Sequence, residues 1–192
     1  GMAFGWHDLS LINLANGHLV EDVKLGLDLC QQGKPPAFCP EALVTSQFPL
    51  SQQGLNSQRT RWEHGHLGLM LADAPKRAMA AITQRNASLA ALTLDLLVPP
   101  LALLVLTLLG LNLVTWLAYL LFGLAAPAWL AFAGLALLAF AVMLAWARFC
   151  REVIPFSVLL YAPFYAARKI PLYLSFLIKR QVEWVRSKRD DD

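Results

Sequence analysis

Charged side chains are scarce in this sequence, and they are unevenly placed. Of the 192 residues, only 15% are Asp, Glu, Lys or Arg, whereas 57% are hydrophobic. Between Arg85 and Arg148 the only charged residue is Asp95, and this interval is long enough for two helical crossings of a bilayer at about 20 residues each. This composition excludes an ordinary soluble domain. We therefore expect a membrane protein.

Cysteine is rare as well, and its spacing excludes two kinds of site. Cys30, Cys39 and Cys150 form no Cys-x-x-Cys pair, so neither a disulfide framework nor a zinc site is indicated, and the thiols are expected to be reduced and cytosolic. The chain does not start with a basic stretch and an apolar core, which predicts no signal peptide and a start in mid-domain. The net charge is +3, with the basic residues beside the apolar segments. This pattern indicates membrane orientation and no binding of nucleic acid.

Two apolar stretches are predicted to cross the membrane, over residues 88–122 and 128–147. The first contains Pro99-Pro100, a pair that either kinks a membrane helix or marks the point where a surface helix turns into the bilayer. The turn between the stretches, residues 123–127, has no Lys or Arg, as expected of an outer loop. We interpret Asp95 as an interfacial anchor, with a place along a polymer channel as the alternative.

A further apolar segment, residues 155–178, is interrupted by Pro163, Arg168-Lys169 and Pro171. A third crossing would carry the basic tail to the outer side, against the positive-inside rule. We therefore predict an interfacial or re-entrant segment followed by a cytosolic tail. The predicted location is a multi-pass cell membrane of the bacterial inner-membrane type, with the C-terminus on the cytoplasmic side.

The polar half of the chain contains a predicted helix over residues 20–32, which Gly33 and the prolines after it end. Glu21 and Asp22 fall in its first turn, where acidic residues commonly complement the helix dipole without any role in catalysis. A short strand is predicted over residues 37–45, because this segment is partly β-branched and bounded by prolines.

A second helix is predicted over residues 54–72. In it Gln58, Arg61, Trp62 and Gly65 have the spacing i, i+3, i+4 and i+7, which places an amide, a guanidinium and an indole on one face. A guanidinium suits phosphate oxygens and an indole suits a sugar ring. The alternative is a membrane-surface helix with a basic face.

The same helix carries two histidines, His64 and His66. Their spacing of i and i+2 points the two rings to different faces of a helix. We interpret them as structural or acceptor-lining residues and not as metal ligands, since no His-Glu-x-x-His pattern is present.

Gln58-x-x-Arg61-Trp62 resembles the QxxRW signature of the membrane-bound family-2 glycosyltransferases, the group of cellulose, hyaluronan and poly-N-acetylglucosamine synthases. Upstream, Val20-Glu21-Asp22 resembles the ED motif of the same family. Gly1-Met2-Ala3-Phe4 resembles its Gly-rich acceptor loop, although Gly1-Met2 is also what a cloning scar leaves at the start of a chain. The predicted membrane spans follow in the order that the family has them.

The resemblance implies a division of the chain into three parts. Residues 1–86 would be the C-terminal part of a cytosolic α/β glycosyltransferase domain of the GT-A type. Residues 87–149 would be two transmembrane helices, and residues 150–192 an amphipathic interfacial segment with the basic tail. The family's nucleotide-binding strands, and the Asp-x-Asp that holds Mg²⁺ or Mn²⁺, precede the acceptor loop and have no counterpart here. We therefore expect the C-terminal part of a longer enzyme, without a metal site of its own and inactive without the missing N-terminal half.

The resemblance also implies a reaction, the inverting transfer of a sugar from a nucleotide donor, UDP-linked, to a growing polysaccharide. Asp22 would be the general base, and Glu21 would orient the loop or contact the acceptor glycan. Gln58 and Arg61 would hydrogen-bond the donor pyrophosphate or nearby hydroxyls, and Trp62 would stack on the acceptor sugar. Transfer of a single sugar to a lipid, and a membrane subunit without enzymatic activity, are the alternatives.

Overall fold

The computed structural model describes residues 2–10, 12, 17–45 and 51–178. In these residues all regular secondary structure is helical, so the α/β part of the predicted fold is unconfirmed. The chain divides into two compact units, an amino-terminal unit of residues 1–99 and 176–192 and a hairpin unit of residues 100–175. Gly1 and the tail after residue 178 lie outside the described residues, and what was expected of them stays a prediction.

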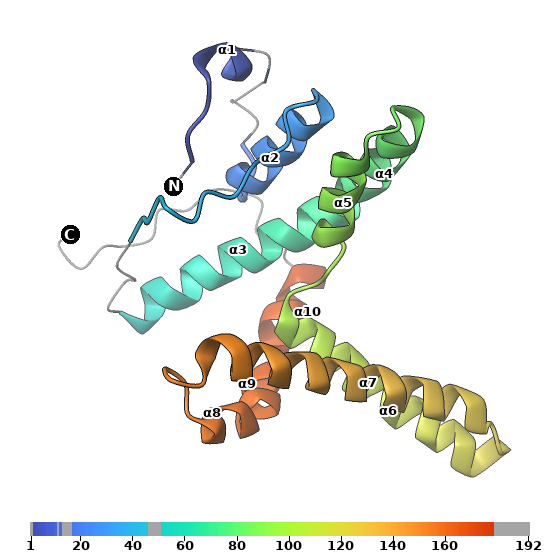
Figure 1. Cartoon of the computed structure of the whole chain (residues 1–192). Coiled ribbons are helices and arrows are strands. Elements are labelled where there is room, and N and C mark those ends of the chain that lie inside the picture. Colours follow the sequence, from blue (N-terminus) through green and yellow to red (C-terminus); the bar gives the residue numbers. More distant parts are fainter. Residues whose placement is uncertain (1, 11, 13–16, 46–50, 179–192) are drawn as a thin grey trace. The chain divides into compact units, whose positions relative to one another are not determined.

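The amino-terminal unit contains the helices that carry the candidate site (Figure 1). They are α1 (Trp6–Leu9), α2 (Glu21–Gln31), α3 (Gln52–Ala72), α4 (Ala74–Thr83) and α5 (Ala87–Leu96), with the end of α10 (Ile170–Ile178). The helices predicted over residues 20–32 and 54–72 are confirmed as α2 and α3, with ends that differ by one or two residues.

The end of α2 is fixed by a glycine. Gly33 has φ 78°, a left-handed conformation that glycine adopts without steric cost. The N–H of Gly33 donates to the Cys30 carbonyl at 3.0 Å, and the N–H of Lys34 donates to the Leu29 carbonyl at 2.9 Å. These two bonds form a Schellman motif, which confirms the predicted stop.

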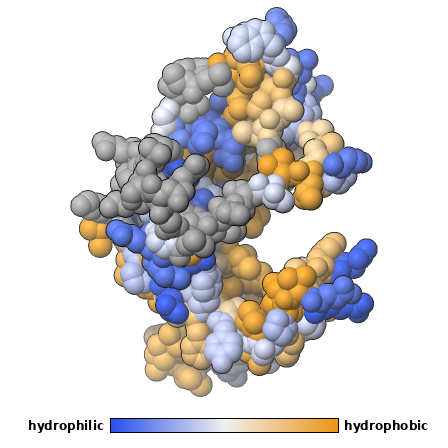
Figure 2. Space-filling view, turned by 90° about the vertical axis from the view of Figure 1, so that its left-hand side faces the viewer, coloured by the Kyte–Doolittle hydropathy of each residue, from blue (hydrophilic) through white to orange (hydrophobic). Residues whose placement is uncertain are grey.

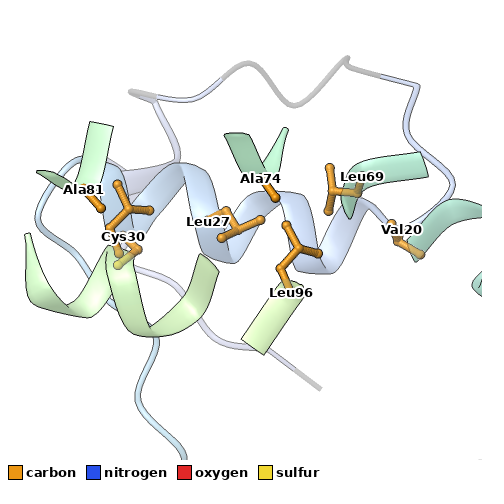
Figure 3. Close-up of a cluster of buried hydrophobic side chains, with 8 residues drawn as sticks. Val20, Leu27, Cys30, Leu69, Ala74, Ala81 and Leu96 are labelled. Atoms are coloured by element: carbon orange, nitrogen blue, oxygen red, sulfur yellow. The ribbon is translucent and has the colours of Figure 1, made fainter. Parts of the chain in front are cut away.

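The core of this unit is a cluster of buried side chains from four helices and the residue before α2 (Figure 3). In α4 and again in α5 its members are seven residues apart and therefore lie on one helix face. The alanines among them let the helices approach closely. The cluster consists of Val20, Leu27, Cys30, Leu69, Ala74, Ala81, Leu89 and Leu96.

Two polar side chains hold α2 against α4 and α5. Asn86 caps α5 by accepting from the Leu89 N–H at 2.9 Å, and its amide group donates to the Cys30 carbonyl at 2.9 Å. Arg77 of α4 donates to the side chains of Asp28 and Gln31 on α2. The helix that begins at the Glu21-Asp22 pair is thus anchored along its second half.

The strand predicted over residues 37–45 is wrong. The segment is irregular with a turn at Pro40-Glu41, and its apolar side chains Phe38, Leu43 and Val44 are exposed. A strand needs a partner for its backbone hydrogen bonds, and the described residues provide none. The β-branched residues of this segment therefore do not form a strand, because no other strand among the described residues pairs with them.

The hairpin unit is built on two long helices, α6 (Leu101–Phe122) and α7 (Ala125–Ala145), followed by a π-helical turn over Trp146–Cys150. Two short helices, α8 (Phe156–Leu160) and α9 (Ala162–Arg168), and most of α10 complete it. The predicted first span of 88–122 is therefore interrupted. Its first part is α5, and α6 begins only after Pro99-Pro100, because proline ends a helix and suits the position just before a new one.

The helices α6 and α7 run side by side (Figure 1) and are joined by Gly123, which has φ 72°. Between them the Asn112 amide donates to the Ala131 carbonyl at 3.0 Å. Residues 101–122 and 125–150 are long and apolar enough to cross a membrane, by length and composition. Few of their side chains are buried. On the face of the molecule drawn in Figure 2, hydrophobic side chains also reach the surface in several places.

Asp95 and the segment of residues 155–178 are both outside these two candidate spans. Asp95 is exposed near the end of α5. The segment of residues 155–178 forms the short helices α8, α9 and α10, each shorter than a bilayer requires. The interfacial placement of both stays a prediction.

Candidate functional site

The helix α3 presents the three side chains of the QxxRW pattern. It starts at Ser51, whose hydroxyl accepts from the Gly54 N–H at 3.2 Å as an N-cap. Gln58 and Arg61 are half-buried, and the indole of Trp62 is 44% exposed. Half-burial fixes the direction of the amide and the guanidinium, while the open indole leaves a flat apolar surface for a ligand.

The two acidic residues of the ED pattern begin α2. Both Glu21 and Asp22 are exposed, and Asp22 accepts a hydrogen bond from the Val23 N–H at 2.8 Å. The N-cap position itself is Val20, which has no side chain able to cap. Asp22 thus accepts one hydrogen bond from the backbone of the first turn and remains exposed to solvent.

Gly65 is the point where α3 contacts the segment just before α2. A Cβ atom at Gly65 would lie 2.8 Å from Val20 Cγ1 and 3.0 Å from Leu19 Cβ, closer than side chains pack. The segment just before Glu21-Asp22 therefore rests directly on α3, one turn after Trp62. Helical spacing places Gly65 on the same face as the QxxRW side chains. The structure shows that Leu19 and Val20 contact this face at Gly65.

The histidines on either side of Gly65 have separate partners. His64 is buried, and its ring meets Phe176 edge-on with 5.3 Å between centroids. His66 lies with Nε2 3.1 Å from the Val98 carbonyl oxygen, just before the proline pair. The prediction that the two rings face different ways is confirmed.

No group of three or more His, Cys, Asp or Glu side chains in residues 2–10, 12, 17–45 and 51–178 is arranged to hold a metal ion. All three cysteines are free, and burial raises the pKa of the Cys30 thiol, which keeps it protonated and unreactive at neutral pH. Cys30 is thus a core residue and not a nucleophile.

Residues 2–179 match the family described as Glycosyl transferase family group 2. The chain belongs to this family. No curated protein and no solved structure matches it. The family match extends over both the ED and the QxxRW helices and over both candidate spans, so a glycosyl-transfer function applies to the chain as a whole.

The described residues of the predicted acceptor loop have no regular secondary structure, unlike α2 and α3. Met2, Ala3 and Phe4 are irregular and exposed, and Gly1 lies outside the described residues. Their position at an acceptor site stays a prediction, as do the roles of Asp22, Glu21 and the QxxRW side chains.

Two contacts at this site could not be predicted from the sequence, although the residues that make them were identified there. Gly65 receives the Leu19-Val20 segment, and His66 binds the backbone before the proline pair. The available signal was a glycine inside a helix, where its cost to helix stability indicates a reason in packing or function. Spacing alone does not say which segment approaches.

Proposed function

We propose that this chain is the acceptor-side and membrane part of a polysaccharide synthase of the cellulose, hyaluronan or poly-N-acetylglucosamine type. The observation that carries the proposal is the close contact of Gly65 with Leu19-Val20. It holds the start of α2, with its two carboxylates, against the helix that carries an amide, a guanidinium and an indole. An inverting transfer to a sugar hydroxyl needs these kinds of groups at one place.

Asp22 is the proposed general base. Its carboxylate takes the proton of the acceptor hydroxyl while the hydroxyl oxygen attacks the anomeric carbon of the donor sugar. The bond from that carbon to the donor phosphate breaks on the opposite side, its electron pair leaves with UDP, and the configuration inverts. The exposure of Asp22 supports this role because an acceptor can reach it. Glu21, also exposed, is proposed to contact the acceptor.

Arg61 and Gln58 are the proposed contacts to the leaving pyrophosphate. Negative charge grows on the phosphate oxygens as the sugar departs, and a guanidinium fork stabilises that charge with directed hydrogen bonds. The half-burial of both side chains supports the role because a charged hydrogen bond is stronger away from water. Mg²⁺ or Mn²⁺ is proposed to be held by residues other than those described here.

Membrane crossing by α6 and α7 completes the proposal. With the basic residues that flank them on the cytoplasmic side, the two helices would place the site at the inner surface and give a growing polymer a route outward. The exposed aliphatic side chains of both helices support a lipid environment.

Trp62→Ala is expected to weaken use of the acceptor about tenfold, because an aromatic stacking contact is worth about 1.5 kcal/mol beyond its buried area. The measurement compares polymer formation with hydrolysis of the UDP-sugar in membranes that contain the complete enzyme. Hydrolysis is expected to stay nearly constant.

Trp6→Ala is the matched control, since the Trp6 indole is 86% exposed on α1, and it should leave both rates unchanged. Equal losses of polymer formation and hydrolysis in Trp62→Ala would contradict the stacking role. A product of one sugar on a lipid would assign the chain to the lipid-acceptor alternative.

We also propose that the 192-residue chain alone binds no UDP tightly. Its described residues contain neither a strand nor a metal-binding cluster to hold a nucleotide. Isothermal titration of the chain with UDP and MnCl₂ is expected to give no heat of binding. A dissociation constant in the micromolar range would show that α2 and α3 suffice to bind the donor.

A further inference from the structure

A groove of about 460 Å³ lies between α4 and α5, away from the proposed donor and acceptor residues. This volume falls in the range of small-molecule sites, about 300–1,000 Å³. Most of its lining side chains are aliphatic, a mixture of alanines with larger residues: Ala78, Ala81, Ile82, Ala87, Ala90, Leu94 and Leu97. Ile82 and Leu94 are largely exposed, so the groove offers an apolar surface that water covers poorly.

One cation lines this groove at the turn between α4 and α5. Arg85 and Asn86 form the turn between α4 and α5, and both line the groove. The Asn86 amide already bonds Cys30 and Leu89. Within the described part of the chain the Arg85 guanidinium makes no ion pair, and α4 and α5 carry a single acid, Asp95, near the far end of α5. The guanidinium is therefore available to an anion.

The backbone of Arg85 is strained. It has φ 50°, the one positive φ of a non-glycine residue in the described chain. The N–H of Arg85 donates to Ile82 at 3.2 Å and the N–H of Asn86 donates to Ala81 at 2.9 Å, the same Schellman motif that ends α2 with Gly33. Glycine is the ordinary choice for this position. A side chain kept there against strain points to a function of the guanidinium.

The groove is also close to the membrane along the chain. Only residues 97–100 separate α5 from α6, the first candidate span. Leu97, which lines the groove at the carboxyl end of α5, is only four residues before the start of α6, a distance of at most about 14 Å along an extended chain. Phospholipids have an apolar chain next to a charged phosphate.

We propose that this groove binds an anionic phospholipid, with one acyl chain between α4 and α5 and the phosphate paired with Arg85. The aliphatic walls match the acyl chain, and the guanidinium fork matches phosphate oxygens at one end. The site lies outside the residues of the proposed sugar transfer, and the inference rests on the membrane crossing by α6 that the proposed function includes. It ties the amino-terminal unit to acidic lipid.

The test is native mass spectrometry of the 192-residue chain in neutral detergent, titrated with palmitoyl-oleoyl phosphatidylglycerol or the matching phosphatidylcholine. Phosphatidylglycerol is expected to bind about fivefold more tightly, the effect of one basic residue near an anionic headgroup. Arg85→Gln should remove this preference and Arg85→Lys should keep it. The matched control is Lys76→Gln, which removes an exposed cation of α4 that does not line the groove.

A second pair of variants tests the apolar walls. Leu94→Gln, at an exposed groove position, should weaken both lipids. Met79→Gln, equally exposed on α4 but outside the groove, should change neither. Equal effects within either pair would indicate general attraction to lipid and overturn the proposal. So would a dimer whose mass disappears in Leu94→Gln, because the groove would then hold a second copy of the chain.

Arg85→Gly separates binding from structure. Glycine relieves the strained φ, so thermal stability is expected to rise while the preference for phosphatidylglycerol is lost. A stable Arg85→Gly chain that keeps its preference would overturn the assignment of the phosphate to Arg85.

Discussion

Asp22→Asn is expected to lower sugar transfer by the complete enzyme about 10³-fold, because a general base contributes about 10²–10⁴ in rate. The amide oxygen of asparagine can still accept the bond from the Val23 N–H that Asp22 accepts now, so α2 should begin unchanged. The measurements are kcat and KM for polymer formation, with UDP binding by titration. UDP affinity is expected to be preserved, since only the proton acceptor is lost.

Glu41→Gln is a suitable control for Asp22→Asn. It removes an exposed carboxylate in the irregular segment after α2, and activity should not change. Retention of substantial activity in Asp22→Asn would mean that another group takes the proton. Loss of UDP affinity along with activity would place Asp22 in donor binding.

Gly65→Ala is expected to cost the amino-terminal unit about 1–3 kcal/mol of stability, as over-packing of a close contact does. The added methyl group would meet Val20 Cγ1 at 2.8 Å, so the segment before α2 must move away from α3. Because the proposed function needs the start of α2 on α3, polymer formation should fall about 100-fold, the loss that a shift of about 1 Å causes. Thermal unfolding and transfer rates measure the two effects.

Gly26→Ala provides the contrast. Gly26 lies inside α2, where a Cβ would meet only Pro36 at 3.9 Å, and alanine there should stabilise the helix by about 0.5–1 kcal/mol. In the double variant Gly65→Ala with Val20→Ala, the shorter side chain should restore part of the activity. No restoration, with the fold intact, would separate Gly65 from the α2 contact.

The limits of α2 and α3 were predictable because their causes are local, whereas the sequence predicts a first span over residues 88–122 and leaves the effect of its proline pair open between a kink and a turn. Gly33 ends α2 through its own left-handed φ, and Pro99-Pro100 ends the apolar run of α5 through missing N–H groups. The strand over residues 37–45 failed since pairing is not local. Its apolar side chains needed a partner strand, and the described chain has none.

The site was predictable as a set of residues but not as an arrangement. Spacing placed Gly65 on the face of Gln58 and Arg61, because a helix period fixes faces. It could not show that Leu19-Val20 contacts that face at Gly65, since tertiary contacts between distant segments leave little trace in one sequence. The strained backbone of Arg85 could not be predicted either, because an arginine between two helices is common and only its φ is unusual.

The contact of His64 with Phe176 has a consequence for biosynthesis. The ribosome makes α3 early and α10 late, and both candidate spans are made between them. The buried ring of His64 lacks this neighbour until Phe176 has left the ribosome. The core cluster from Val20 to Leu96 is complete along the chain before the spans are made, whereas the contact of α3 with α10 must wait until both apolar spans have left the ribosome.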